Sequence, residues 1–447
     1  MSKKVTILET KLERIKADGY EDDEVRFITE HIKVDDLVRD RATAKNSDVN
    51  LNRSSIKSKI TNEASKENER KSMPANKKLL MLPGDGIGSE VMHQVKRIIE
   101  WMDKARHVSI DITEGLVGGV CYDKHGCSIT DQTMADALNA DAVLVGAVGG
   151  PKWDKVKRED QPEQALLRFR KELDLFANLR PAFVYPALAE FSSLKKNLVA
   201  GLDLLIIREL TSGVYLGESH GIEDLSGGEK PAIHSSVYTP SEIERVCRLA
   251  FEIARKRQMR VTSVEKGNVT ETATLWREIV SAVHSDGYSD VKLSHLDADN
   301  CAKQLVRQPE QFDIIVTDKH CGKILSGCAA MLTGPVGMLP SASLGSPDKS
   351  GRRKAMYGPV HGTAPNITGQ NKANPLAMIL SYAMCLRYSF EMVEDANLLE
   401  LAVQKVLEGG LRTGDIMQSG MTLVSCEQMG GAVITELKLM EQGFCLE

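Results

Sequence analysis

From Lys77 onward, short apolar runs alternate with longer stretches whose apolar residues recur at helical intervals. The run KKLLML ends at Pro-Gly-Asp-Gly, and the stretch EVMHQVKRIIEWM that follows has helical spacing. DAVLVGAVGG, NLVAGLDLLIIREL, RVTSVEKGN and FDIIVTD are further runs typical of strands, and SEIERVCRLAFEIARKR is one of the helical stretches between them. Strands that alternate with helices predict an α/β fold with a largely parallel sheet.

Residues 1–76 differ from the rest of the chain because they are dense in Lys, Glu, Asp, Ser and Asn and have few aromatic residues. Apolar residues recur near helical spacing between Ile7 and Ile15, whereas residues 46–71 have the composition of a solvated linker. We therefore expect residues 1–76 to form a polar extension that is disordered or partly helical. This extension is either a dispensable tail or a segment that docks a partner.

The composition excludes several classes of function. A chain of 447 residues with 42% hydrophobic residues is long enough for two packed domains. Its net charge of −5 provides no basic field for nucleic acid or an anionic membrane, and no apolar run approaches the roughly 20 residues of a membrane span. Nine cysteines without a CxxC pair favour reduced thiols. We therefore expect a cytoplasmic protein without nucleic-acid or membrane partners, which binds a small molecule and a second copy or a relative.

Two groups of residues are suited to anionic ligands. The turn Gly84–Gly88 follows a predicted strand and opens a predicted helix, so its N–H groups either face an anion or serve only a tight turn. It lacks the GxGxxG spacing of Rossmann folds. Arg170, Arg180 and Arg208 would grip a dicarboxylic acid if they cluster, and would be surface salt-bridge partners if they do not.

Eight sequence strings, in order and without large gaps, resemble one enzyme family. They are LPGDGIG, GAVGGPKWD, RKELDLFANLRPA, RELTSGVYLGE, VEKGNVTETATLWRE, QFDIIVTD, AAMLTGPVGMLPSASLG and VHGTAPNITGQNKANP. The chain resembles the isocitrate/isopropylmalate β-decarboxylating dehydrogenases from about Lys77 to its C-terminus, and is most similar to the 3-isopropylmalate dehydrogenases among them. The resemblance implies a two-domain fold that is not a Rossmann fold. Its cofactor-binding domain would comprise residues 77–175 and 334–447, and its substrate and dimerisation domain residues 176–333.

The resemblance also implies an activity and roles for individual residues. The reaction would be oxidative decarboxylation of 3-isopropylmalate to 4-methyl-2-oxopentanoate with reduction of NAD, a step of leucine biosynthesis. Arg170, Arg180 and Arg208 would bind the carboxylates of the malate. Lys266 would be the general base for the substrate hydroxyl and Tyr215 would protonate the enol, and both side chains suit these roles.

Substrate choice within the family is expected to depend on the helix before Arg170. Isocitrate enzymes have a polar group there for a third carboxylate, whereas this chain has Leu166 and Leu167, which would suit an isopropyl group. The cofactor contacts that the resemblance implies are Gly149, Gly150, Asn268, His361, Gly362, Ala364, Pro365, Asn366, Ile367 and Asn374. Asn366 replaces an aspartate of NAD-dependent relatives, so we expect NAD with weaker discrimination against NADP.

The resemblance breaks down at the expected metal site. Relatives bind Mg²⁺ or Mn²⁺ next to the substrate through three aspartates, one of which comes from the other subunit of a dimer. Asp299 matches one of these ligands, while Lys323 and Gly327 occupy the other two positions. Because a hard divalent ion needs oxygen ligands, we expect no ordinary Mg²⁺ or Mn²⁺ site in this chain.

Three interpretations of this change are open. In the first, the chain is an active dehydrogenase in which Lys323 replaces the ion. In the second, it is a catalytically impaired pseudoenzyme or a regulatory subunit of an active relative, in which Lys323 pairs with Asp299 of the partner subunit. In the third, a softer site for zinc is formed by His320, Cys321, Cys328 and Cys301.

Overall fold

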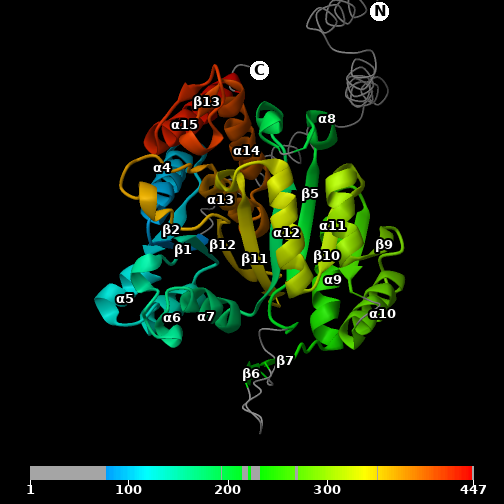
Figure 1. Cartoon of the computed structure of the whole chain (residues 1–447). Coiled ribbons are helices and arrows are strands. Elements are labelled where there is room, and N and C mark those ends of the chain that lie inside the picture. Colours follow the sequence, from blue (N-terminus) through cyan, green and yellow to red (C-terminus); the bar gives the residue numbers. More distant parts are fainter. Residues whose placement is uncertain are drawn as a thin grey trace, which may run out of the picture. The chain divides into compact units, whose positions relative to one another are not determined.

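The computed structural model describes residues 77–192, 194–213, 220–222, 232–266, 270–349 and 351–444 (Figure 1). The predicted polar extension, residues 1–76, lies outside these ranges, and so do the predicted site residues Tyr215 and Asn268.

One large mixed sheet organises the described chain. Its strands are β1 (Lys77–Gly84), β2 (Ile110–Glu114), β3 (Ala142–Ala147), β4 (Leu175–Phe183), β5 (Asp203–Glu209), β8 (Arg260–Glu265), β9 (Lys292–Asp297), β10 (Ile314–Thr317), β11 (Pro340–Pro347) and β12 (Arg353–Pro359). Their order across the sheet is β2-β1-β3-β12-β11-β4-β5-β10-β8-β9. Most neighbours are parallel, but β4 is antiparallel to both β11 and β5, and β11 is antiparallel to β12. The predicted α/β class with a parallel or mixed sheet is confirmed.

The helices connect these strands and cover the sheet. They are α4 (Gly88–Arg106), α5 (Gly119–His125), α6 (Asp131–Asn139), α7 (Gln164–Glu172), α8 (Lys196–Val199), α9 (Pro240–Ala254), α10 (Glu271–Ser285), α11 (Ala298–Arg307), α12 (Lys319–Thr333), α13 (Leu376–Tyr388), α14 (Val393–Glu408) and α15 (Cys426–Phe444). Two small sheets pair β6 (His220–Ile222) with β7 (Ala232–His234), and β13 (Leu411–Arg412) with β14 (Thr422–Leu423).

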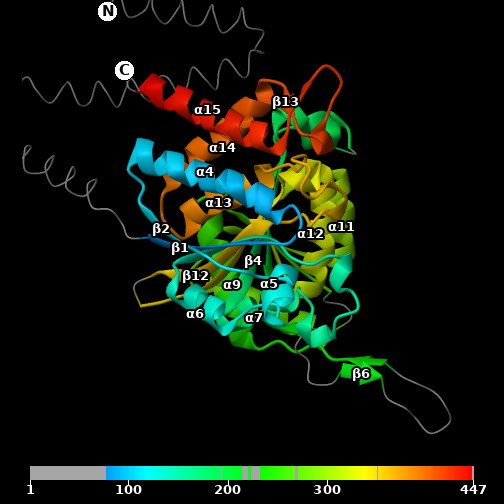
Figure 2. The same cartoon turned by 90° about the vertical axis from the view of Figure 1, so that its left-hand side faces the viewer.

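Both faces of the large sheet are buried, because successive residues of a strand point to opposite sides. In β5, Leu205 and Ile207 join one apolar cluster, whereas Leu204 and Ile206 join another. The first cluster includes α4, α9, α10 and α13 to α15, and Figure 2 shows α14 and α15 lying outside α13. On the opposite face, α6 and α7 pack over β1 and β3, and α11 and α12 pack over β4, β5 and β10. A cavity lies between α7 and α12, which belong to these two groups of helices.

Helix α12 begins directly after β10 because Asp318 caps it. The Asp318 carboxylate accepts a hydrogen bond from the Cys321 N–H at 2.7 Å. Cys321 and Leu325, four residues apart, are buried against the sheet. Lys323 and Gly327 are also four residues apart, but both are exposed. The two positions therefore lie together on the open side of α12, which is the side away from the sheet.

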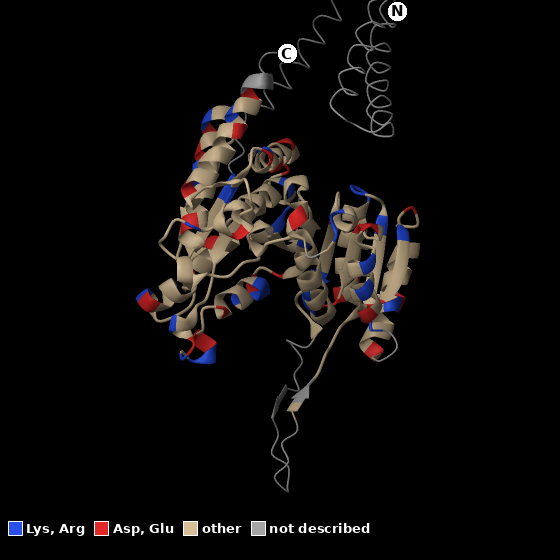
Figure 3. Cartoon of the chain, turned by 45° about the horizontal axis from the view of Figure 1, so that its top comes forward, with Lys and Arg blue, Asp and Glu red and all other residues tan. Residues whose placement is uncertain are grey.

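Charged residues of both signs are interspersed over the described chain (Figure 3). No helix within the described ranges is both long enough and apolar enough to cross a membrane. The cysteines that the structure describes are free thiols.

The turn between β1 and α4 depends on a glycine. Gly84 has a φ of +72°, and a Cβ atom at this position would lie 2.0 Å from the carbonyl oxygen of Ala147 in β3. Only a residue without a side chain combines this backbone conformation with so close an approach.

We predict that Gly84→Ala lowers the free energy of unfolding by about 2–5 kcal/mol. The loss would arise because alanine is strained in the left-handed backbone conformation and because its Cβ atom would clash with the Ala147 carbonyl oxygen. Gly126→Ala is the matched control, because Gly126 also has a φ of +72° but a Cβ there would meet nothing within 4 Å. The control should lose only about 1–2 kcal/mol. Urea denaturation of both variants measures the difference, and equal losses would show that the contact with Ala147 is unimportant.

Candidate functional site

A cavity of about 510 Å³ lies between α7 and α12, above β4 and β5. Cationic side chains line one part of it, namely Arg170, Arg180, Arg208, Lys319 and Lys323. Apolar residues line the rest, namely Leu167, Pro181, Ala182, Leu210, Ala329, Ala330, Met331, Val336, Leu339 and Val360, together with Ser326 and Gly327. No Asp or Glu is among the described residues that line it. The cavity therefore combines charge of one sign with an apolar wall.

The structure brings the three predicted arginines together. Arg170 lies in the last turn of α7, Arg180 in β4 and Arg208 in the neighbouring strand β5. All three line the cavity, so the clustering that the sequence left open is present.

Asn178 orients two of these guanidinium groups. Its Oδ1 accepts hydrogen bonds from the Nε atoms of Arg180 and Arg208, each at 2.8 Å. Its Nδ2 donates to the Ala342 carbonyl at 2.9 Å and to Ser343 Oγ at 3.2 Å. The β4–β5 register places Asn178 opposite Arg208, and Arg180 is two residues further on the same face of β4. Sequence analysis missed Asn178, whose only signal was this spacing in FANLRP.

The arginine cluster holds like charges close together in a buried setting. Burial and the neighbouring Arg208 and Arg170 lower the pKa of Arg180 to about 9. Burial also lowers the pKa of Arg170, whose Nε has no hydrogen-bond partner among the described residues. Buried donors are almost always satisfied in folded proteins, and like charges destabilise one another. These guanidinium groups are therefore suited to an anion that enters the cavity.

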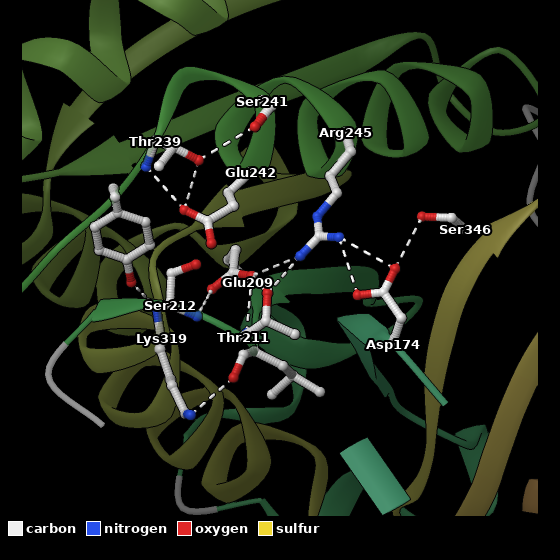
Figure 4. A network of polar contacts seen from close by, with 12 residues as sticks. Asp174, Glu209, Thr211, Ser212, Thr239, Ser241, Glu242, Arg245, Lys319 and Ser346 are labelled. Atoms are coloured by element: carbon white, nitrogen blue, oxygen red, sulfur yellow. Dashed lines mark hydrogen bonds and ion pairs between the residues drawn. The ribbon is translucent and has the colours of Figure 1, made fainter. Parts of the chain in front are cut away.

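Lys319, to which sequence analysis gave no role, adds a titratable cation. Figure 4 shows its position next to the end of β5, where its Nζ donates to the Leu210 carbonyl at 2.7 Å. Burial, with smaller contributions from Arg170 and Arg208, lowers the pKa of Lys319 to about 8, and Glu209 opposes this decrease. The charge of this side chain thus changes within an accessible pH range.

The carboxylate next to Arg208 serves the fold and does not line the cavity. Glu209 is fully buried, and it accepts hydrogen bonds from the N–H groups of Thr211 at 2.8 Å and Ser212 at 2.9 Å (Figure 4). Burial raises its pKa, although these hydrogen bonds oppose the increase. Arg245 of α9 donates to Thr211 Oγ1 at 2.5 Å. This network holds the chain that follows β5.

The predicted base and metal ligand lie apart from the arginines. Lys266 Nζ donates to Asp299 Oδ1 at 3.1 Å, and both side chains are exposed. This hydrogen bond lowers the pKa of Asp299, and Lys303 lies 3.9 Å away. Neither Lys266 nor Asp299 lines the cavity of the same chain, so their predicted roles remain predictions.

Only one of the two predicted leucines faces the cavity. Leu167 is among its lining residues, whereas Leu166 packs against the apolar cluster beneath α7. The difference arises because consecutive residues of a helix point about 100° apart.

The residues present do not fit a divalent cation. Lys323 and Gly327 line the cavity at the two ligand positions, and Asp299 is paired with lysines. Within the described ranges, no three His, Cys, Asp or Glu side chains form a group that could hold a metal ion. The zinc interpretation is therefore wrong, since all four of its residues are described and form no such group; they are His320, Cys321, Cys328 and Cys301.

The Gly-rich turn supports the predicted cofactor loops. Asp85 is buried, and its carboxylate accepts hydrogen bonds from the N–H groups of Gly119, Val120 and Gly149, each at 2.8 Å. Ile87 N–H donates to the carbonyl of Thr363 at 3.0 Å. The turn therefore forms its hydrogen bonds with backbone groups of the fold. These bonds connect the glycines after β3 and the loop after β12 to the start of α4.

Several predicted cofactor residues are placed where a polar ligand could reach them. Gly362, Pro365 and Asn366 are exposed. His361 Nε2 is buried and has no hydrogen-bond partner among the described residues, and burial lowers the pKa of this imidazole. Asn374 differs, because it is buried and its amide is bonded within the fold, to Asp415 Oδ2 and the Leu376 N–H. The exposed loop and the unpartnered imidazole fit a dinucleotide.

We predict that Asn178→Ala weakens binding of 3-isopropylmalate, the ligand that the resemblance implies, by about tenfold, because two guanidinium groups lose their orientation. The free energy of unfolding should fall by about 1–3 kcal/mol. Titration calorimetry and denaturation measure the two effects. Ser343→Ala is the control, since it removes one hydrogen bond to Asn178 and leaves the arginine contacts; unchanged affinity in Asn178→Ala would contradict the assignment.

We further predict that affinity for this dicarboxylate falls as pH rises through about 8, because Lys319 then loses its positive charge. The charged groups that act on Lys319 are Arg170, Arg208 and Glu209. Burial and the neighbouring arginines lower the pKa of Arg180 to about 9, so this side chain follows Lys319 as the pH rises. Lys319→Met should remove the step near pH 8. Identical pH profiles for the two proteins, measured by calorimetry, would refute this account.

Comparison with known proteins identifies the family. Residues 78–433 match the profile of the family described as isocitrate/isopropylmalate dehydrogenase. A 3-isopropylmalate dehydrogenase of Rhodospirillum rubrum is 57% identical over 366 residues, which cover 82% of this chain and 99% of that protein. A 3-isopropylmalate dehydrogenase of Cereibacter sphaeroides is 59% identical over 364 residues, which cover 81% of this chain and 99% of that protein. The crystal structure of isocitrate dehydrogenase from Methylococcus capsulatus matches with a TM-score of 0.69 and 28% identity, over 81% of this chain and 99% of that one. The chain therefore belongs to the isocitrate/isopropylmalate dehydrogenase family.

Proposed function

We propose that this chain oxidatively decarboxylates 3-isopropylmalate to 4-methyl-2-oxopentanoate with NAD as the hydride acceptor, in leucine biosynthesis. The observation that carries the proposal is a single cavity in which an arginine cluster faces an apolar wall. Relatives named 3-isopropylmalate dehydrogenase, at 57% and 59% identity, support the same reaction.

The substrate would use both parts of the cavity. Its carboxylates would bind Arg170, Arg180 and Arg208, whose planar guanidinium groups can each grip a carboxylate through two hydrogen bonds. Its isopropyl group would lie against the apolar wall, to which Leu167 and Val336 contribute. Each buried methylene contributes about 0.8 kcal/mol, so this wall would favour isopropylmalate over malate.

NAD would be held by the loops that Asp85 and Ile87 anchor. His361 and Asn366 offer hydrogen-bonding groups there, and the exposed backbone around Gly362 allows close approach. Bound NAD would supply the hydride acceptor. Because Asn366 carries no negative charge to repel a 2′-phosphate, discrimination against NADP would be weak.

A homodimer would complete this site. The Lys266–Asp299 pair is exposed and separate from the cavity of its own chain, as is required of groups that act in a partner's cavity. Ile324 and Met331 of α12 are exposed large apolar side chains, which supports an interface near this helix. The same surface would serve a heteromer with an active relative. Free thiols support a cytoplasmic location.

The two predicted domains fit this site. On one side of the sheet, the strands come from residues 77–175 and 334–447; they are β2, β1, β3, β12 and β11. On the other side, the strands come from residues 176–333, apart from the first residue of β4. The cavity takes Leu167 and Val336 from the first set of residues and Arg208 and Lys323 from the second. Substrate and cofactor would thus meet where the domains join.

We predict that the purified chain produces NADH from NAD and 3-isopropylmalate. The absorbance of NADH measures this turnover. Arg170→Ala should lower kcat/KM by about 100-fold, the effect of losing a charged contact of about 3 kcal/mol. Arg168→Ala should leave turnover unchanged, because Arg168 lies on the same helix but forms surface ion pairs with Glu172 and Asp131.

The same assay separates active enzyme from impaired subunit. Neither relative named above carries the name of a regulatory subunit, so the comparisons give that alternative no support. Binding of 3-isopropylmalate without formation of NADH would overturn the proposed activity. That result would support the alternative of a catalytically impaired subunit.

A further inference from the structure

The open side of α12 carries an ammonium group where relatives are expected to have a carboxylate. Lys323 and Gly327, one helical turn apart, both line the cavity. Replacing two carboxylates by an ammonium group and a hydrogen atom changes the local charge from about −2 to +1. A divalent cation would thus lose two oxygen ligands and meet a like charge in their place.

The other lining residues reinforce this change. The described lining has cationic side chains, Arg170, Arg180, Arg208, Lys319 and Lys323, and no carboxylate. Every one of these groups repels a metal ion and attracts an anion, most strongly in the parts of the cavity where water is scarce. The two ammonium groups, of Lys319 and Lys323, together equal the charge of one divalent cation.

We propose that this cavity binds its dicarboxylate ligand without a divalent cation, and that Lys319 and Lys323 supply the positive charge that an ion supplies in relatives. The inference relies on the proposed function only for the identity of the ligand. Lys323 lies at the exposed rim of the cavity, where a long flexible side chain can reach an anion bound by the arginines. Lys319, anchored on the Leu210 carbonyl, is held at the end of β5.

Titration calorimetry of the full 447-residue chain with 3-isopropylmalate tests the proposal directly. We expect dissociation constants in EDTA and in excess Mg²⁺ to agree within about twofold. An affinity about tenfold higher with Mg²⁺ would overturn the inference and leave the proposed function intact. Binding in neither condition would overturn the proposed ligand, and this inference with it.

Lys323→Gln tests the ammonium group itself. Its affinity in EDTA should be about tenfold weaker, the effect of losing one charge-assisted contact, and Mg²⁺ should not restore it. Lys405→Gln on α14 is the control, because Lys405 is exposed, lies outside the cavity and pairs with Glu408. Equal affinity for Lys323→Gln and the unchanged chain would overturn the role of Lys323.

The reverse change tests whether these positions decide metal use. A Cβ atom at Gly327 would meet nothing within 4 Å, so an aspartate is accommodated there. Lys323→Asp combined with Gly327→Asp should bind the ligand weakly in EDTA and recover with Mn²⁺. Paramagnetic resonance should show bound Mn²⁺ in this double variant and none in the unchanged chain. Bound Mn²⁺ in the unchanged chain, or a double variant as tight in EDTA as that chain, would overturn the inference.

Discussion

The cavity depends on how like charges are held together at the centre of a sheet. Asn178 makes this arrangement possible, because one amide oxygen accepts from the Nε atoms of both Arg180 and Arg208 while its amide nitrogen is bonded to β11. Asn178 lies on β4, which is antiparallel to both of its neighbours, β11 and β5. The arginine cluster is therefore built on the antiparallel part of the sheet.

The helices beside this centre divide the remaining tasks. Helix α7 brings Arg170 and Leu167 to the cavity, so it provides one cation and part of the apolar wall. Helix α12 starts with Lys319 against the end of β5 and presents Lys323 one turn later. The carboxylates near these groups are engaged elsewhere: Glu209 holds the chain after β5, and Asp299 is paired with Lys266. The described residues that line the cavity thus offer cations, and no carboxylate, to a ligand.

Much of this arrangement could be anticipated from the sequence, and the rest depended on three-dimensional contacts. The alternation of strands and helices and the matched strings predicted the α/β fold, and the arginines converge as their strings implied. Asn178 was missed because its role arises only from the cross-strand register that places it opposite Arg208. Lys319 was missed because an ammonium group becomes titratable near neutrality only through burial beside other cations, which composition does not reveal.

A cavity whose charged lining residues, among those that the structure describes, are all cations has a consequence for the chain outside its reaction. Small anions such as sulfate or phosphate are attracted to it, and any that bind the folded state and not the unfolded chain stabilise the fold by mass action. Each tenfold excess over the dissociation constant contributes about 1.4 kcal/mol. Arginines that bind anions in the folded state would therefore couple the thermal stability of the protein to the anion content of its surroundings, so that its melting temperature would be a joint property of chain and medium.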